Sequence, residues 1–134
     1  MLHKRLADYF SAIESAVQRL TDERDIERYE EEVLTPDRVN LRLRLRFANG
    51  RLLEVSEALV ATAGGLQTLG YRYHCQDRQQ ALVFRYDDTP HFPGLATFPH
   101  HKHLPEQVIT ATKPALMLVL EEAAMPASSL PDQP

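Results

Sequence analysis

Apolar and polar side chains alternate without interruption in residues 39–47, which read VNLRLRLRF. Successive side chains of a β-strand point to opposite faces of the sheet, so this period of two predicts a strand with one apolar and one arginine-rich face. The next three residues, 48–50, read ANG, which is typical of a hairpin turn. The stretch therefore predicts an antiparallel sheet with one buried face.

The register of this hairpin follows from the need to bury apolar side chains on one face. A strict two-residue Asn-Gly turn would set Leu45 opposite Glu54, which mixes the two faces. A register with Gly50 in a left-handed bulge keeps the faces separate, and we expect this one. It gives three cross-strand pairs: Leu45 with Leu53, Leu43 with Val55, and Arg44 with Glu54.

The remaining elements are predicted from the same kinds of pattern. Apolar residues recur every three or four positions in residues 2–20, which indicates a helix with one buried side. Thr112 is a candidate cap for a second helix that ends near Ala124, with Pro114 in its first turn. Strands are expected at residues 26–34, 39–47, 51–60, 71–76 and 82–87. Because short turns join consecutive strands, the expected fold class is α+β, a five-stranded antiparallel meander on which an N-terminal and a C-terminal helix pack.

The hairpin between residues 71–76 and 82–87 has a polar turn. A four-residue loop would set three apolar pairs on one face: Tyr71 with Tyr86, Tyr73 with Phe84, and Cys75 with Leu82. The same register would set Arg72 opposite Arg85 on the other face. Like charges directly opposite each other destabilise a sheet, so this pairing mildly favours a bound anion.

The composition is that of an ordinary globular domain. The chain has 134 residues, a net charge of −4 and 43% hydrophobic residues, so we expect one domain over residues 1–125 and a disordered tail over 126–134. Its apolar runs are far shorter than the ~20 residues that span a bilayer, and we expect a cytoplasmic protein without membrane contact. The single cysteine, Cys75, excludes an intrachain disulfide and a multi-cysteine zinc site, and we expect it to be inert core. Because the net charge is acidic, overall basicity does not support nucleic-acid binding, and a local basic patch would be needed.

Charged residues and histidines gather where the last predicted strand ends. Arg85 and Asp87 are two residues apart, so both project from one face of the sheet. Residues 89–105 contain four prolines and no periodicity, which is typical of a long, ordered loop with a function. Arginine can bind a phosphate, and histidine can move protons near neutral pH. The candidate catalytic residues are Arg85, Asp87, His91, His100, His101 and His103, and the candidate substrate-binding residues are Arg72, His74 and Lys102.

Other interpretations of these residues stay open. Arg85 and Asp87 can form an ordinary surface ion pair, and the histidines can belong to a solvated loop. A metal site is less favoured, because residues 100–103 lack the i, i+4 spacing of common zinc motifs, and no metal or cofactor is expected. The arginine row Arg42, Arg44 and Arg46 can bind nucleic acid or a partner, but pairing with Glu30, Glu32, Glu54 and Glu57 on the flanking strands is favoured.

Three segments resemble the TumE family of toxins from type II toxin–antitoxin modules. They read GYRYHCQD (70–77), FRYDDTPH (84–91) and TFPHHKHL (97–104), and the wider resemblance covers about residues 25–122. Cys75 stands where the family often has an aromatic residue. The resemblance implies a small toxin encoded beside its antitoxin, commonly a helix-turn-helix DNA-binding protein, and ribonuclease activity is the usual expectation for such toxins.

The first hypothesis is therefore a metal-independent endoribonuclease. His91 or His101 would take the proton of a ribose 2′-hydroxyl, and His103 would protonate the leaving 5′-oxygen. Arg85 and Lys102 would hold the phosphate, while Asp87 would orient a histidine or Arg85. One alternative is a non-enzymatic toxin that binds its target or antitoxin through the loop and the arginine row, and another is a metal-dependent nuclease. An exposed edge strand would be the seam for a homodimer or for a complex with the antitoxin.

Overall fold

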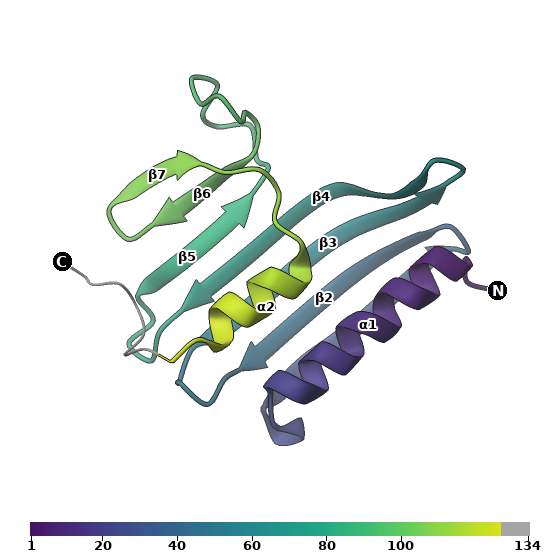
Figure 1. Cartoon of the computed structure of the whole chain (residues 1–134), viewed down its shortest axis with the longest axis horizontal. Coiled ribbons are helices and arrows are strands. Elements are labelled where there is room, and N and C mark those ends of the chain that lie inside the picture. Colours follow the sequence, from purple (N-terminus) through teal and green to yellow (C-terminus); the bar gives the residue numbers. More distant parts are fainter. Residues whose placement is uncertain (127–134) are drawn as a thin grey trace.

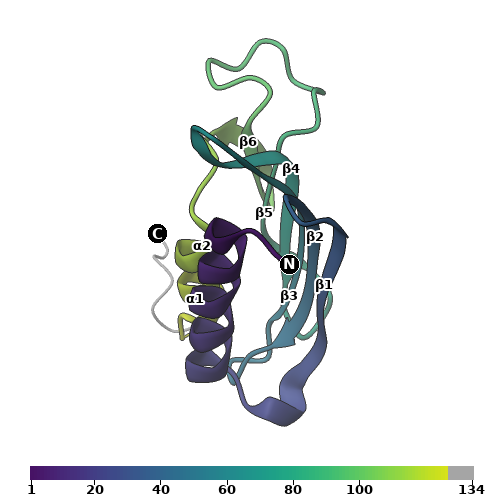
Figure 2. The same cartoon turned by 90° about the vertical axis from the view of Figure 1, so that its right-hand side faces the viewer.

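The alternating stretch forms the second strand of an antiparallel sheet. The computed structural model describes residues 1–126, so most of the predicted C-terminal tail, residues 127–134, lies outside the described residues. The elements are α1 (Lys4–Leu20), a 3₁₀ turn (Glu23–Asp25), β1 (Ile26–Thr35), β2 (Arg38–Arg46), β3 (Leu52–Thr62), β4 (Gly65–Gln76), β5 (Leu82–Asp87), β6 (His101–Leu104), β7 (Gln107–Thr110) and α2 (Leu116–Ala124). In this part of the chain the strands follow one another in a single sheet in the order β1 to β7. Figure 1 shows β2 to β7, and Figure 2 shows β1 beside β2.

The register of the β2–β3 hairpin is the expected one. Leu43 lies opposite Val55, Leu45 opposite Leu53, and Arg44 opposite Glu54. Gly50 has a φ of 88°, the left-handed conformation that the bulge requires and that glycine adopts without steric cost. The alternation therefore determines both the strand and its partner, because a slip by one residue would expose every leucine of β2.

The sheet has seven strands instead of the predicted five. Residues 101–104 and 107–110 form the β6–β7 hairpin, and β6 pairs with β5, so the aperiodic connection shortens to residues 88–100. The four residues of β6, which read HKHL, alternate histidine with lysine and leucine. Since neither face of β6 is uniformly apolar, the alternation of hydrophobicity that reveals a strand is missing.

The β4–β5 hairpin also departs from its predicted register by two residues. Cys75 lies opposite Phe84 and Tyr73 opposite Tyr86, so apolar side chains still pair on one face, but with partners two residues further along β5. A bulge at Cys75–Gln76 and a turn in which Gln80 has a φ of 67° account for the shift. The predicted Arg72–Arg85 pair does not form, because Arg72 lies opposite Asp87. The charge repulsion that favoured a bound anion is therefore absent.

The second helix begins later than predicted. Its N-cap is Ala115, which makes no side-chain capping hydrogen bond, so Thr112 is not the cap and Pro114 precedes the helix. The residue before a proline is disfavoured in helical conformation, which keeps Lys113 outside the helix. The Lys113 ammonium also lies over the rings of Tyr71 and Tyr73, with Nζ 5.6 and 5.7 Å from the ring centroids. These contacts hold the segment before α2 against the sheet.

Both helices cover the same face of the sheet (Figure 2). Their apolar sides are buried against the leucines and aromatic rings of β2 to β5: Leu6, Phe10, Ile13 and Val17 of α1, and Leu116, Val119, Leu120 and Ala123 of α2. We call the opposite sheet face the open face, because no helix of the described residues packs on it. Within residues 1–126, neither helix is long and apolar enough to cross a membrane.

One glutamate that was expected to pair with the arginine row lies on the other face of the sheet. Glu57 is on the helix-covered face of β3, where it is 2% exposed and accepts hydrogen bonds from the hydroxyls of Tyr9 and Tyr73. The expected pairing of Glu57 with the arginines is therefore wrong. On the open face, Arg44 pairs with Glu27 and Glu54 instead.

Candidate functional site

The sheet register places the candidate residues in two rows across the open face. One row runs through Arg42, Ser56, Arg72, Asp87 and His101, each opposite the next on neighbouring strands. The adjacent row runs through Arg44, Glu54, His74, Arg85 and His103. Side chains two residues apart on a strand share a face, so Arg85 and Asp87 of β5 meet His101 and His103 of β6.

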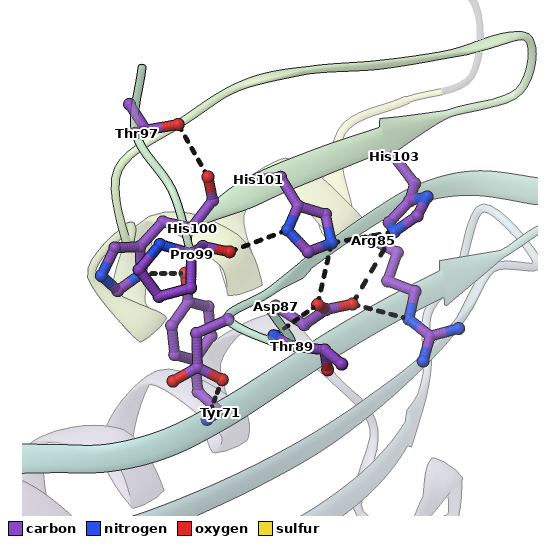
Figure 3. Close-up of polar contacts among 10 residues, drawn as sticks. Tyr71, Arg85, Asp87, Thr89, Thr97, Pro99, His100, His101 and His103 are labelled. Atoms are coloured by element: carbon purple, nitrogen blue, oxygen red, sulfur yellow. Dashed lines mark hydrogen bonds and ion pairs between the residues drawn. The ribbon is translucent and has the colours of Figure 1, made fainter. Parts of the chain in front are cut away.

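Asp87 is the centre of this cluster. Its side chain is 4% exposed and accepts hydrogen bonds from Nε of Arg85 at 3.1 Å and from the backbone N–H of Thr89 at 3.0 Å. Nε2 of His101 lies 2.9 Å from its Oδ1, and Nε2 of His103 lies 3.9 Å from its Oδ2. Figure 3 shows both imidazoles and the guanidinium turned toward this carboxylate. A buried carboxylate needs such partners, because an unpaired charge is costly to bury.

His101 is the most buried histidine of the cluster, with 1% of the residue exposed. Its Nδ1 lies 2.9 Å from the carbonyl oxygen of Pro99 and must donate, because a carbonyl only accepts. Its Nε2 is directed at Asp87 and also lies 3.1 Å from Nε2 of His103. His101 therefore faces the interior of the cluster and has almost no access to solvent.

His103 forms the solvent-accessible side of the cluster, with 28% of its side chain exposed. Burial lowers the pKa of its imidazole, a positive charge on His101 would lower this pKa further, and Asp87 opposes both effects. The ring of Phe92, from the loop after β5, lies over both histidines, with centroid distances of 4.9 Å to His101 and 5.8 Å to His103. The loop thus covers the cluster from one side and leaves His103 partly open.

The other candidate residues lie outside this cluster. His100 is within hydrogen-bond distance of the Tyr71 hydroxyl, at 2.9 Å, and His91 is exposed on the loop. Lys102 points to the helix-covered face, where Nζ donates to Glu122 at 2.9 Å, so its position does not support the predicted phosphate contact. His74 lies beside Arg85 in the register, and its buried Nδ1 has no hydrogen-bond partner among the described residues. Burial also lowers the pKa of His74.

A polar hollow of about 300 Å³ lies on the open face over β1 to β4. Arg28, Arg42 and Arg72 line it, and a second hollow of about 270 Å³ shares Arg42 and Arg72. These three arginines are exposed and have no carboxylate within 4.0 Å in residues 1–126. Unpaired guanidinium groups are suited to bind phosphates. Arg72, which lines the hollow, lies opposite Asp87 of the cluster.

The cluster also has the composition of a metal site. One ligand atom each from Asp87, His101 and His103 lies within 4.8 Å of the others. A His-x-His segment places both imidazoles on one face when it forms a strand. Residues 100–103 lack the helical spacing of common zinc motifs, and β6 lacks the alternation of hydrophobicity that reveals a strand, so the sequence alone does not indicate this arrangement.

Comparisons with known proteins agree with the resemblance noted in the sequence. A sequence model described as toxin TumE matches residues 13–124. No curated protein and no solved structure matches the chain. The matched segment contains the whole sheet and the Asp87 cluster. The chain therefore belongs to the TumE family of toxins.

Proposed function

We propose that this toxin cleaves RNA at the Arg85–Asp87–His101–His103 cluster. The observation that carries the proposal is the row across the open face, in which unpaired Arg42 and Arg72 lead over neighbouring strands to Asp87 and His101. Neighbouring strands are about 5 Å apart, so this row extends roughly 15 Å from Arg42 to Asp87. A short stretch of single-stranded RNA can contact the arginines and the cluster at the same time.

The three unpaired arginines supply the binding surface. The net charge of the chain is −4, so RNA binding requires a local concentration of positive charge. Arg28, Arg42 and Arg72 provide it in one hollow, whereas the guanidinium groups of Arg44 and Arg46 are held by Glu27. Because such a surface contacts phosphates and not base edges, it favours binding with little dependence on RNA sequence.

The cluster supplies groups that act on a phosphodiester. Arg85 donates to Asp87 through Nε, and its two terminal nitrogens, which make no hydrogen bond within the described residues, point away from Asp87 (Figure 3). They are available to neutralise the charge that develops on a phosphate. His101 is 1% exposed, so it is poorly placed to take a proton from a ribose hydroxyl, and His91 is exposed on the loop beside Phe92. His101 is a positioning residue, and His103 and Arg85 face the substrate.

Membership of the family supports an antitoxin as the partner of this toxin. We propose that the antitoxin acts by keeping RNA away from the open face. The expectation that it is a helix-turn-helix DNA-binding protein stays a prediction, as does an assembly through an edge strand.

The test combines growth with RNA integrity. Wild type, Asp87→Asn and His103→Gln are expressed from a tightly repressed promoter, and the purified proteins are incubated with single-stranded RNA. We expect wild type to arrest growth and fragment RNA, and both variants to lose these effects. His3→Asn is the control, because His3 caps α1 and asparagine is a good capping residue. Growth arrest with intact RNA, or full cleavage by both variants, would refute the proposal.

A further inference from the structure

Three potential metal ligands converge in the Asp87 cluster. Nε2 of His101 is 2.9 Å from Oδ1 of Asp87 and 3.1 Å from Nε2 of His103, and Nε2 of His103 is 3.9 Å from Oδ2 of Asp87. Asp87 and His101 are buried, and His103 is partly exposed. One ligand atom from each residue lies within 4.8 Å of the others, so the three side chains can reach one ion, with His103 on the exposed side.

The hydrogen bond at the other side of His101 determines which atom is free to coordinate. Nδ1 carries a proton, because it donates to the carbonyl of Pro99. In the neutral imidazole the lone pair is then on Nε2, which faces the Asp87 carboxylate at 2.9 Å. This lone pair and the carboxylate oxygen can both coordinate one cation.

The spacing of the three atoms fits a cation. Metal–nitrogen and metal–oxygen bonds are about 2.0–2.2 Å long, so ligands of one ion lie roughly 3 Å apart at right angles and about 3.4 Å apart in a tetrahedron. Nε2 of His101 lies 2.9 Å from Oδ1 of Asp87 and 3.1 Å from Nε2 of His103, which is close to these values, and one ligand atom from each of the three residues lies within 4.8 Å of the others. Small side-chain rotations would therefore bring all three atoms to bonding distance.

The surroundings of the cluster also match those of metal sites. Histidine ligands usually donate their second ring N–H to a carbonyl or carboxylate, as His101 does to Pro99. Carboxylate ligands are usually held by hydrogen bonds as well, as Asp87 is by Arg85 and Thr89. Phe92 of the loop packs edge-to-face against both imidazoles.

We propose that Asp87, His101 and His103 bind a divalent first-row transition-metal ion. Two imidazoles and one carboxylate favour zinc, manganese, iron or cobalt over magnesium and calcium, which prefer oxygen ligands. Three protein ligands leave further coordination positions, and His103 is the partly exposed ligand. A phosphate oxygen at one of these positions could coordinate the ion. The binding of the ion stands on the cluster alone, whereas this role toward a phosphate rests on the proposed function.

The test measures binding of metal to the full chain without RNA. The protein is stripped with a chelator, dialysed, and titrated with Zn²⁺ by calorimetry and with Co²⁺ by visible absorption. We expect one ion per chain, and we expect Asp87→Asn and His103→Gln each to weaken binding by more than about 100-fold, since losing an outer-shell partner alone costs about 10- to 100-fold. His3→Asn is the control and retains the affinity of wild type. Circular dichroism in chelator establishes that each variant is folded.

The outcomes separate this inference from the proposed function. Failure of wild type to bind Zn²⁺ and Co²⁺, or equal affinity in folded His103→Gln and wild type, would overturn the metal site. RNA cleavage that persists in excess chelator would overturn the role toward phosphate and retain the nuclease. A protein that binds one ion through these residues but leaves RNA intact would retain the metal site and refute the nuclease.

Discussion

The unpaired arginines of the open face give a quantitative prediction about RNA binding. In the variant Arg28→Gln/Arg42→Gln/Arg72→Gln, the three guanidinium groups without a carboxylate partner are removed, while the sheet and the cluster stay intact. Each phosphate contact on a single strand changes the slope of log K against log salt by about 0.7, so three contacts account for a slope of about 2. Between about 50 and 200 mM salt, wild type should lose roughly 15- to 20-fold more affinity than the triple variant.

The assay is fluorescence anisotropy with a labelled single-stranded RNA over a series of salt concentrations. All proteins carry His103→Gln, so that the RNA stays intact, and in this assay the single variant His103→Gln takes the place of wild type. The matched control is Arg19→Gln/Arg24→Gln/Arg46→Gln, which changes the net charge by the same amount but removes arginines already paired with Glu121, Asp22 and Glu27. The control should retain most of the wild-type slope. Equal slopes in wild type and the first triple variant would refute the binding surface. An equal loss of slope in both triple variants would show that the net charge, and not these three arginines, determines RNA binding.

Three further predictions concern residues on the helix-covered face. Lys102→Gln should leave RNA affinity unchanged, because Lys102 lies on the face opposite the cluster and pairs with Glu122. A lower RNA affinity of this variant in the anisotropy assay would show that Lys102 contacts the substrate. Tyr73→Phe removes one of the two hydroxyl donors to buried Glu57 and should lower the free energy of unfolding in urea by about 1–3 kcal/mol. The loss should exceed that of Tyr29→Phe, whose hydroxyl lies 3.4 Å from the Phe10 carbonyl and interacts with the exposed Glu31. Burial raises the pKa of the Cys75 thiol to about 12, so an aromatic disulfide reagent should modify it at mildly alkaline pH only after unfolding. Because folding raises the thiol pKa, the contribution of the buried neutral thiol to the free energy of unfolding is complete below the ordinary thiol pKa. It declines as the pH rises toward 12, and urea titrations at increasing pH measure this decline.

The sequence predicts which residue types form the candidate site, but it predicts only part of their arrangement in space. Arg85 and Asp87 are two residues apart on a strand, so their common face followed from the sequence. His91, His100 and Lys102 were predicted as site residues because they are close to Asp87 in the sequence. In the structure they lie outside the Asp87 cluster, because residues 88–100 form an irregular loop and because Lys102 alternates with the histidines of β6.

The sequence by itself determined the β2–β3 hairpin, its register and the amphipathic helix α1. In each case the decisive signal lies within a few residues, since a period of two or of three to four separates apolar from polar side chains. Tertiary structure alone decided that residues 101–104 become a strand, because their backbone hydrogen-bond partners are supplied by β5 and β7 and not by any local pattern. It likewise decided that Glu57 is buried, since its partners Tyr9 and Tyr73 come from α1 and β4. The convergence of Asp87, His101 and His103 depends on the same strand pairing, which joins residues across a long connection.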